Sequence, residues 1–511
     1  MKKAFFCTII LLIVVFSAAG CNSSTNDTVD DNNMRIAPYN QSVTLLCSTE
    51  IKNRNATYQW YESSDGSTNA GKIIQGATES TFTTPLYDEK GIHHYYCTAT
   101  NKSTTSVSDV TSVAYTALPT VYINTPDSVK ITSKEKWIEN ATISIVGAKN
   151  EAWNFENIET SIRGRGNTTW DRPKKPYALK LNTSQKIMGM PKDKRWVLIA
   201  NYCDQSFMRN EIALYLSELF NLGWTVHGEF ADLVLNGKYN GLYWLGEAIR
   251  VDKNRVNIND GNQNMADNED KDYLIEMQNM ADIDDPVNFS SSIRQMPYLI
   301  KNDDYMIDEN NELTSGGEAR LERLKTKITD LETQLYPDFT AVLDTNECSA
   351  PDESYTKIID IDSWIKFWLV NEIMDNRELG HPKSCFFTFD STNNIFKAGP
   401  VWDFDLAAIR QASSCTVQNT IYYNALFKSP AFIKRTKELW SEYKDSIDIE
   451  PRVESMRTTI DTAVEYDIML WGKHHDNPSD NIFGTFDEEV DFMKETVIKK
   501  INVVDKFING L

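Results

Sequence analysis

The chain has 511 residues, 41% of them hydrophobic, and a formal net charge of −21 at pH 7. At roughly 100–200 residues per domain, this length allows two to four folded domains, and the apolar content excludes a wholly disordered chain. The negative charge argues against binding to nucleic acid, because phosphate backbones need a basic surface. It favours cationic partners or metal ions.

The first residues have the pattern of an export signal. Lys2 and Lys3 precede a mostly apolar run over 4–19, and small residues then lead to Cys21. The segment resembles a lipobox, so we expect residues 1–21 to be a lipoprotein signal peptide whose Cys21 is lipidated. Residues 22–34 would then be a polar tether. The alternative is plain secretion with cleavage nearby. We therefore expect a protein of the bacterial cell envelope, at the outer membrane or cell surface, held to the membrane by lipid alone.

Residues 35–118 alternate like short β-strands separated by turn residues. The order Cys47, Trp60, Cys97, with Tyr95 two residues before the second cysteine, resembles an immunoglobulin domain. This resemblance implies an all-β sandwich with a disulfide between Cys47 and Cys97. The alternative is an unrelated β-sandwich. Such a domain serves as a spacer or a binding module.

From residue 120 to 511 the pattern becomes mixed α and β, which predicts a second domain. The strands expected from alternation cover residues 141–146, 177–181, 196–200, 231–235 and 241–245. Helical periodicity predicts helices over 208–220 and 316–335, a helix capped by Asp362, and a helical last eighty residues. The remaining exported cysteines have no metal-ligand spacing, so they are free thiols or form one further bridge: Cys203, Cys348, Cys385 and Cys415.

A glycine pair in this second domain suggests an anion site. In Arg163-Gly164-Arg165-Gly166 the glycines let backbone N–H groups approach a phosphate, and the arginines add positive charge. Lys180 follows on a predicted strand, as the nucleotide-binding lysine does in kinases. The alternatives are an ordinary turn for the glycines and a solvated strand position for Lys180.

Two acidic clusters flank a predicted hairpin. Asp375 and Glu378 follow a helix, the hairpin strands cover 385–389 and 395–398, and Asp403-Phe404-Asp405 comes next. Kinases place a catalytic loop, a hairpin and a metal-binding aspartate in this order. Asp403 and Asp405 are therefore candidate ligands for Mg²⁺ or Mn²⁺. The alternative is that Asp403 caps a turn.

Taken together, most of residues 120–511 resemble the CotH (spore-coat protein H) kinase family. The phrases that carry the resemblance are 163–167 with Trp170, 174–181, 196–202 with Asp204, 209–210, 235–243, Glu247, 273–277, 299–301 and 399–406. The resemblance implies an α+β atypical protein-kinase-like domain with a helical C-terminal part. It also implies ATP as phosphate donor, a divalent metal and transfer to Ser or Thr of proteins.

By position, the resemblance assigns Lys180 to the phosphates, Asp403 to the metal, and Glu247 either to the adenine-side linker or to ordering the site. One departure bears on catalysis. Active members of the family resemble Asn-x-Asp after the catalytic helix, whereas this chain has Asn376-Arg377-Glu378, with Asp375 displaced toward the helix. Catalytic geometry tolerates little displacement. Two hypotheses follow: an ATP-dependent protein kinase acting outside the cytoplasm, or a catalytically weak kinase-like surface module that binds a protein or glycan. The sequence names neither the substrate nor the surface ligand.

Overall fold

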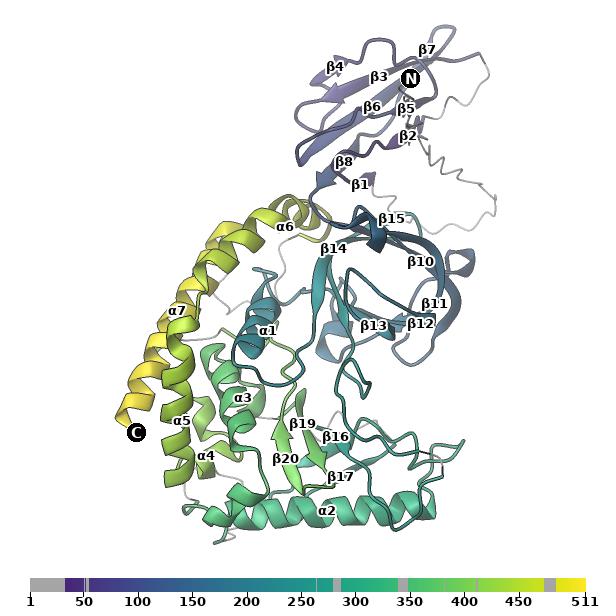
Figure 1. Ribbon diagram of the computed structural model, residues 1–511. Helices are drawn as coiled ribbons and strands as arrows, with labels where there is room; N and C mark the ends of the chain where they lie inside the picture. Colours follow the sequence, from purple (N-terminus) through teal and green to yellow (C-terminus); the bar gives the residue numbers. More distant parts are fainter. Residues whose placement is uncertain are drawn as a thin grey trace, which may run out of the picture. The chain divides into compact units, whose positions relative to one another are not determined.

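The computed structural model describes residues 33–49, 51, 55–262, 264–278, 286–338, 348–380, 382–409, 412–472 and 484–511. It divides into two compact units, Met1–Ala117 and Leu118–Leu511 (Figure 1). The predicted signal peptide, Cys21 and the tether up to residue 32 lie outside the described residues. Of the helices that the described residues form, none is long and apolar enough to cross a membrane.

In the first unit, the regular elements of the described residues are all β-strands. One sheet has the strand order β1-β8-β6-β3-β4, with β7 also paired to β6, and a smaller sheet pairs β2 with β5. The strands are β1 (Met34–Pro38), β2 (Thr44–Leu46), β3 (Thr57–Ser63), β4 (Gly71–Ile73), β5 (Thr81–Thr83), β6 (Gly91–Asn101), β7 (Thr104–Val107) and β8 (Thr111–Thr116). The β-rich character expected for this region is confirmed.

The core of this unit contains the aromatic and cysteine residues that the sequence singled out. Trp60 on β3 lies directly opposite Cys97 on β6, and both are buried with Tyr95. Cys47 and Cys97 are free thiols in this structure. Burial, and then hydrogen bonding to the Cys47 thiol, raise the pKa of Cys97, so the two sulfur atoms are neighbours. Their disulfide stays a prediction for the exported, oxidised protein.

The second unit begins with a closed barrel in which apolar side chains fill the interior. The strand order is β10-β11-β12-β13-β15-β14-β9. The strands are β9 (Thr120–Asn124), β10 (Ile138–Val146), β11 (Phe155–Gly164), β12 (Tyr177–Gln185), β13 (Asp193–Ile199), β14 (Gly228–Leu235) and β15 (Lys238–Glu247). Alternate residues such as Ile162, Leu179 and Trp196 are buried inside, so their sequence neighbours point outward.

A helix and a second sheet follow the barrel. Helix α1 (Arg209–Leu219) packs beside it, and the sheet has the order β17-β18-β16-β19-β20. Its strands are β16 (Tyr273–Met277), β17 (Asn288–Ser290), β18 (Pro297–Ile300), β19 (Cys385–Asp390) and β20 (Ile395–Ala398). The predicted hairpin over 385–398 is confirmed.

Six further helices complete the second unit, and α5, α6 and α7 run along one side of it (Figure 1). They are α2 (Ser315–Leu335), α3 (Ile361–Ile373), α4 (Tyr423–Leu426), α5 (Pro430–Tyr443), α6 (Glu450–Trp471) and α7 (Phe486–Gly510). Short 3₁₀ helices occupy Pro126–Ser128, Glu151–Trp153, Thr168–Asp171, Glu353–Lys357, Glu378–Gly380, Val417–Asn419 and Lys444–Ser446. The expectation that Asp362 caps α3 is wrong: Asp360 accepts the N-terminal hydrogen bond from Ser363, and Asp362 pairs with Arg435 at 2.7 Å.

Candidate functional site

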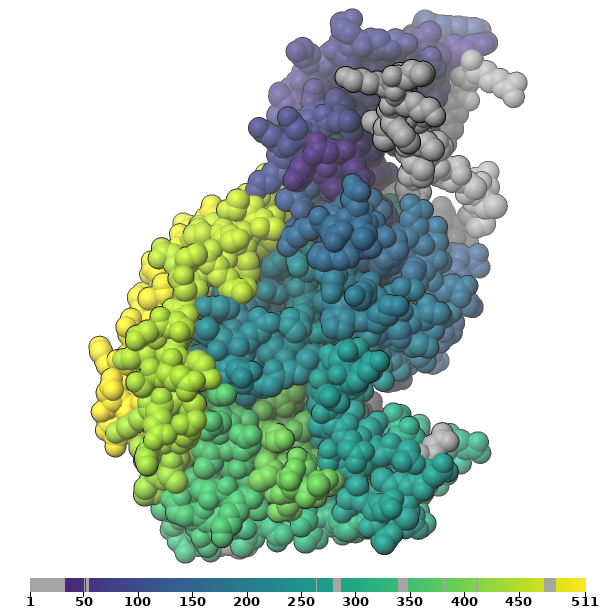
Figure 2. Space-filling view, in the orientation of Figure 1, coloured from purple at the N-terminus to yellow at the C-terminus, as the bar shows by residue number. Residues whose placement is uncertain are grey.

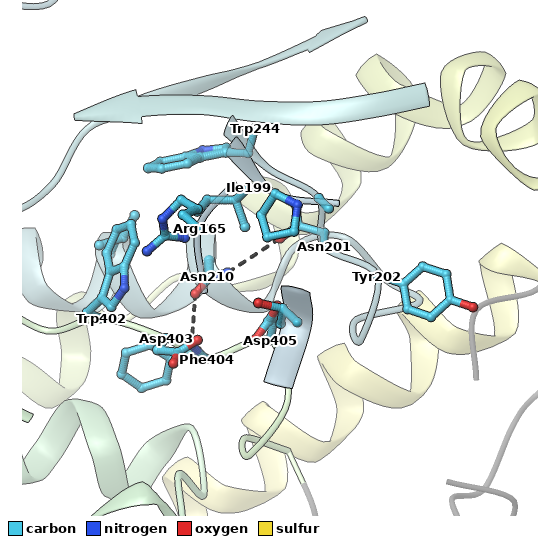
Figure 3. Close-up of a pocket in the computed structure, with 14 residues that line it drawn as sticks. Arg165, Ile199, Asn201, Tyr202, Asn210, Trp244, Trp402, Asp403, Phe404 and Asp405 are labelled. Atoms are coloured by element: carbon cyan, nitrogen blue, oxygen red, sulfur yellow. Dashed lines mark hydrogen bonds between the residues drawn. The ribbon is translucent and has the colours of Figure 1, made fainter. Parts of the chain in front are cut away.

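A pocket lies where one end of the barrel meets α1 and the segment after β20 (Figure 3). It encloses about 520 Å³ of space, including its open mouth. The residues that line it are Arg165, Thr169, Pro176, Ile199, Ala200, Asn201, Tyr202, Asn210, Leu214, Trp244, Trp402, Asp403, Phe404 and Asp405. The glycine-pair segment and the Asp-Phe-Asp segment, more than 230 residues apart in the chain, thus share one pocket.

Arg165 enters the pocket from the turn after β11. Gly164 lets the Trp170 ring pack against the backbone, since a Cβ there would lie 2.1 Å from that ring. Gly166 has a φ of +84°, which favours glycine, and the turn closes through a bond from Arg165 N–H to the Pro176 carbonyl. The guanidinium of Arg165 lies 5.4 Å from the centre of the Trp402 ring. Both glycines therefore shape a turn that directs one arginine into the pocket.

Asp403 and Asp405 place two carboxylates in the same pocket. Asp403 has a φ of +70°, an uncommon conformation that aspartate tolerates better than most residues, and its Oδ2 accepts a 3.0 Å hydrogen bond from Ser384. Burial, and then the Asp403 carboxylate, raise the pKa of Asp405 well above its usual range. Its Oδ1 atom is buried without a hydrogen-bond partner among the described residues. The cations that act on this pair from within the protein include Arg165 and Arg209.

The start of α1 fixes the backbone of the Asp-Phe-Asp segment. The Asn210 side-chain oxygen accepts a 2.8 Å bond from Phe404 N–H (Figure 3), and Arg209 donates to the Asp405 carbonyl at 3.1 Å. Asp204 accepts bonds from Arg209 N–H at 2.8 Å and from the Ser206 hydroxyl at 2.6 Å. These contacts hold the helix start, and through it the two carboxylates, in one geometry.

The two carboxylates fit a divalent cation. Magnesium is commonly held by one or two carboxylates, with water and phosphate oxygens completing its shell. Among the described residues no group of three or more His, Cys, Asp or Glu side chains is arranged to bind a metal, so substrate oxygens and water would have to supply the other ligands. Asp403 and Asp405 would hold the ion, and the unpartnered Oδ1 of Asp405 would be one of its ligands.

Several predicted site residues lie outside this pocket. Lys180 is exposed on the outer face of the barrel, because its strand neighbours Leu179 and Leu181 fill the interior. Arg163 also points outward, with its guanidinium 4.7 Å from the Trp137 ring centre. The structure therefore places only Arg165 of the predicted phosphate cations beside the acidic pair.

Glu247, at the end of β15, is fully buried in a small polar cluster away from the pocket lining. Its Oε2 lies 3.0 Å from the His227 ring nitrogen, and its Oε1 lies 3.7 Å from Arg255. His227 also reaches Glu218 on α1 at 2.9 Å. Glu247 thus links the barrel to α1, which is an indirect connection to the pocket.

Asp375 and Glu378, the candidate catalytic residues after α3, do not line the pocket. Asp375 is fully buried and its Oδ1 lies 3.0 Å from Lys500 of α7, which also contacts Glu372 at 2.9 Å. Glu378 is buried, with 7% of its surface exposed. The pKa of the Cys385 thiol is raised first by the burial of that thiol, then by the Glu378 carboxylate, and also by Asp403. Glu378 therefore lies on the Asp403 side of the site, whereas Asp375 is held by a structural ion pair.

Sequence reasoning did not assign to the site several residues that line the pocket, among them Asn201, Asn210, Trp244 and Trp402. The ring centres of Trp244 and Trp402 lie 6.5 Å apart, and the Asn210 amide donates to Asn201 at 3.4 Å. All four lie in or beside the segments 196–202, 209–210, 235–243 and 399–406. Their position in or beside these segments was the signal in the sequence that could have identified them as site residues.

Comparison with known proteins gives one match that covers more than half of the chain. A family model described as CotH kinase protein matches residues 162–504. Among solved structures, "Crystal structure of Dscam1 isoform 8.4, N-terminal four Ig domains" is 12% identical, with a TM-score of 0.14. That match covers 32% of this chain and 43% of the other, and so low a TM-score carries no argument about the fold. No curated protein matches.

Proposed function

Because the chain belongs to the CotH kinase protein family, we propose that its pocket binds Mg²⁺-ATP (or Mn²⁺-ATP). In this proposal the second unit is an atypical kinase-like domain that transfers phosphate to Ser or Thr of protein substrates. The observation that carries the proposal is the pair of carboxylates, half-buried Asp403 and buried Asp405, in one pocket with Arg165. Opposite charges at these positions match a metal ion and the phosphates it accompanies.

Each residue of the pocket has a task in this proposal. Asp403 and Asp405 hold the cation, whose charge would neutralise the phosphates during transfer. Arg165 donates hydrogen bonds to phosphate oxygens. Trp244 and Trp402 exclude water from the site, which strengthens these electrostatic contacts. Asn210 keeps the Asp-Phe-Asp backbone in place through its bond to Phe404 N–H.

Glu378 is the candidate general base, because its carboxylate acts on the Cys385 thiol, whose pKa the Asp403 carboxylate also raises. A base must come within about 2.6–3.2 Å of the attacking hydroxyl, directly or through one water. Asp375 forms an ion pair with Lys500. We therefore assign the role of general base to Glu378, the other acid of this segment. Because Asp375 is engaged by Lys500 and Glu378 stands where active members have Asp, a second candidate function is a catalytically weak kinase-like surface module that binds a protein or glycan.

Two further parts of the proposal concern the rest of the chain. We propose that the first unit is immunoglobulin-like, since it has two β-sheets and Trp60 lies directly opposite Cys97. We also propose that the protein is lipid-anchored in the bacterial cell envelope. The support for the anchor is the N-terminal sequence that ends at Cys21.

Calorimetric titration of ATP, with and without magnesium, tests the nucleotide site. Asp403→Ala should abolish magnesium-dependent binding, and Arg165→Ala should weaken it by about tenfold or more, as expected for a charge-assisted contact. Lys180→Ala is the matched control, a cation removed outside the pocket, and should bind as wild type does. If Asp403→Ala binds Mg²⁺-ATP as tightly as wild type, this metal assignment is wrong.

Radiolabelled ATP and a protein substrate then separate the two candidate functions. Glu378→Gln should bind Mg²⁺-ATP normally and lose phosphotransfer if Glu378 is the base. A wild type that binds Mg²⁺-ATP and transfers no label would support the binding module. A wild type that binds no nucleotide at all would exclude the kinase and favour the surface-binding module.

A further inference from the structure

A lysine lies within the apolar stripe of helix α7. Lys500 is fully buried, whereas its neighbour Lys499 is exposed. In the space-filling view α7, coloured yellow, lies along one side of the second unit (Figure 2), and its stripe is buried against that unit. A buried ammonium group is costly unless it is paired, so its partners are the first evidence of its role. The apolar members of the stripe, at helical spacing, are Val490, Met493, Val497, Val504 and Ile508.

The partners of Lys500 come from two segments beside the proposed site. Its Nζ lies 2.9 Å from Glu372 at the end of α3 and 3.0 Å from Asp375, in the loop that follows. It also donates a 2.6 Å hydrogen bond to the Ser414 carbonyl. We call residues 374–378 the base loop, because they carry the candidate general base. The residues after the Asp-Phe-Asp segment, 406–409 and 412–417, are the exit segment. One ammonium group therefore joins the two.

Main-chain hydrogen bonds join the base loop to the start of the exit segment. The N–H of Ile409 donates to the Met374 carbonyl at 2.8 Å. The N–H of Arg377 donates to the Ala407 carbonyl at 3.4 Å. The two segments therefore run side by side directly after the metal-binding acids, and a shift of one moves the other.

Glu372 joins the end of α3 to the last part of the exit segment. Its two carboxylate oxygens accept bonds from Thr416 N–H at 3.0 Å and from Val417 N–H at 2.8 Å. Burial raises the pKa of Glu372, and the Lys500 ammonium counteracts that rise. Because both oxygens accept only when the group is ionised, these two bonds depend on the buried cation.

Contacts within the base loop carry the position of Asp375 to Glu378. The Asn376 amide donates to the Asn371 side chain at 2.9 Å, and its oxygen accepts a 3.2 Å bond from Glu378 N–H. Asp375 has a φ of +48°, a strained conformation that persists only where the surroundings impose it. Its carboxylate, held by Lys500, supplies such a constraint three residues before the candidate base.

The metal-binding acids have a separate support. Arg209 donates to the Asp405 carbonyl at 3.1 Å, and Asn210 accepts from Phe404 N–H at 2.8 Å. These contacts come from α1 rather than from α7. Loss of the Lys500 contacts should therefore displace the base loop more than it displaces the two carboxylates.

We propose that Lys500 is a positioning residue of the phosphotransfer site, which sets the base loop against the exit segment so that Glu378 reaches the acceptor hydroxyl. This rests on the proposed function. There, Glu378 takes the proton of a Ser or Thr hydroxyl while the hydroxyl oxygen bonds to the γ-phosphorus and ADP leaves. Lys500 acts only through the loop, and a displacement of about 1 Å at such a base costs about 100-fold in rate.

Steady-state kinetics with radiolabelled ATP, and a serine and threonine peptide library as acceptor, separate positioning from nucleotide binding. Lys500→Met should lower the rate at saturating Mg²⁺-ATP about 100-fold. It should leave the Mg²⁺-ATP affinity, measured by calorimetry, close to that of wild type. Asn210→Ala should instead weaken Mg²⁺-ATP binding about tenfold. Lys499→Met, the exposed neighbour, is the matched control and should change neither quantity.

A more stable variant separates positioning from folding. Lys500→Met combined with Glu372→Gln and Asp375→Asn leaves no unpaired charge in this cluster, so it should be more stable than Lys500→Met alone and remain slow. A wild-type rate in this triple variant would overturn the proposal, because Lys500 would then serve folding alone. A wild-type rate in Lys500→Met would also overturn it, as would a loss of Mg²⁺-ATP affinity as large as the loss of rate.

Hydrogen–deuterium exchange tests the inference without phosphotransfer. In Lys500→Met the amides of Arg377, Ile409, Thr416 and Val417 should exchange faster together, while that of Phe404, held by Asn210, stays protected. Unchanged exchange in the base loop would overturn the proposal. A wild type that transfers no phosphate, with this coupled exchange present in Lys500→Met, would refute the proposed function and leave the link between the two segments standing.

Discussion

At the scale of single residues, His227 shows how a remote group can support the pocket. It contacts Glu247 at 3.0 Å and Glu218 of α1 at 2.9 Å. Hydrogen bonding to Glu247 raises the pKa of His227 above its usual value near 6.5. A raised pKa in the folded state means that the stabilisation is complete below about pH 6.5 and is lost as the pH rises through the folded-state value.

We therefore predict that His227→Gln lowers the free energy of unfolding at about pH 5.5 and has little effect at about pH 8.5. Because His227 is about half exposed, screening limits the loss to roughly 0.5–1 kcal/mol. Urea unfolding of both proteins at the two pH values measures the difference. A loss of the same size at both would contradict a charge-dependent link.

Lys500 is a second residue whose effect reaches the segment beside the site. Its ammonium group is fully buried and contacts Glu372, Asp375 and the Ser414 carbonyl. Lys500→Met would leave two buried carboxylates without their cation, so we predict a loss of about 3–5 kcal/mol in unfolding free energy. Lys499→Met is the control, because Lys499 pairs only with exposed Glu495 and should cost roughly 0.5 kcal/mol or less. Adding Glu372→Gln and Asp375→Asn to Lys500→Met should recover part of the stability.

At the scale of elements, α6 docks onto the first half of strand β15. Lys174 pairs with Asp467 of α6 at 2.6 Å, and Trp471 donates to the Asn240 carbonyl at 3.0 Å. Gly241 makes this approach possible, since its φ is +107° and a Cβ there would lie 2.3 Å from Asp467 Oδ2. The contact ties the C-terminal helices to the barrel.

We predict that Gly241→Ala destabilises the second unit by about 2–4 kcal/mol, through steric overlap and backbone strain. Gly237→Ala is the matched control: its φ is +76°, but no atom lies within 4 Å of the added Cβ. Only the strain term of about 1–2 kcal/mol applies there. Thermal unfolding compares the two variants. An equal loss of stability in both would show that α6 is not closely packed against Gly241.

Elements were easier to predict from the sequence than their surroundings. The hairpin over 385–398 and the turn at Asn236-Gly237 follow from local alternation and turn residues, and both are present. Alternation also placed Lys180 on a strand face. It could not tell that the sheet closes into a barrel, which turns that face outward. The ion pair of Asp375 was equally out of reach, because its partner Lys500 lies 125 residues later, beyond any local pattern.

At the scale of the whole molecule, charge and anchoring act together. A net charge of −21 repels acidic surfaces. None of the helices in the described part of the chain is long and apolar enough to cross a membrane. In the proposed function, Cys21 carries the membrane attachment.

We predict that the mature chain partitions into detergent with the membrane fraction and that Cys21→Ser releases it to the aqueous phase. Lipid chains contribute about 0.8 kcal/mol for each buried CH₂, so attachment needs the acylated cysteine and should vanish without it. Phase separation of cell envelopes followed by immunodetection measures the distribution. Cys203→Ser is the control, because Cys203 lies in the folded second unit and carries no lipid signal. Wild type found wholly in the aqueous phase would refute the lipoprotein assignment and favour plain secretion, with the kinase-like pocket unaffected.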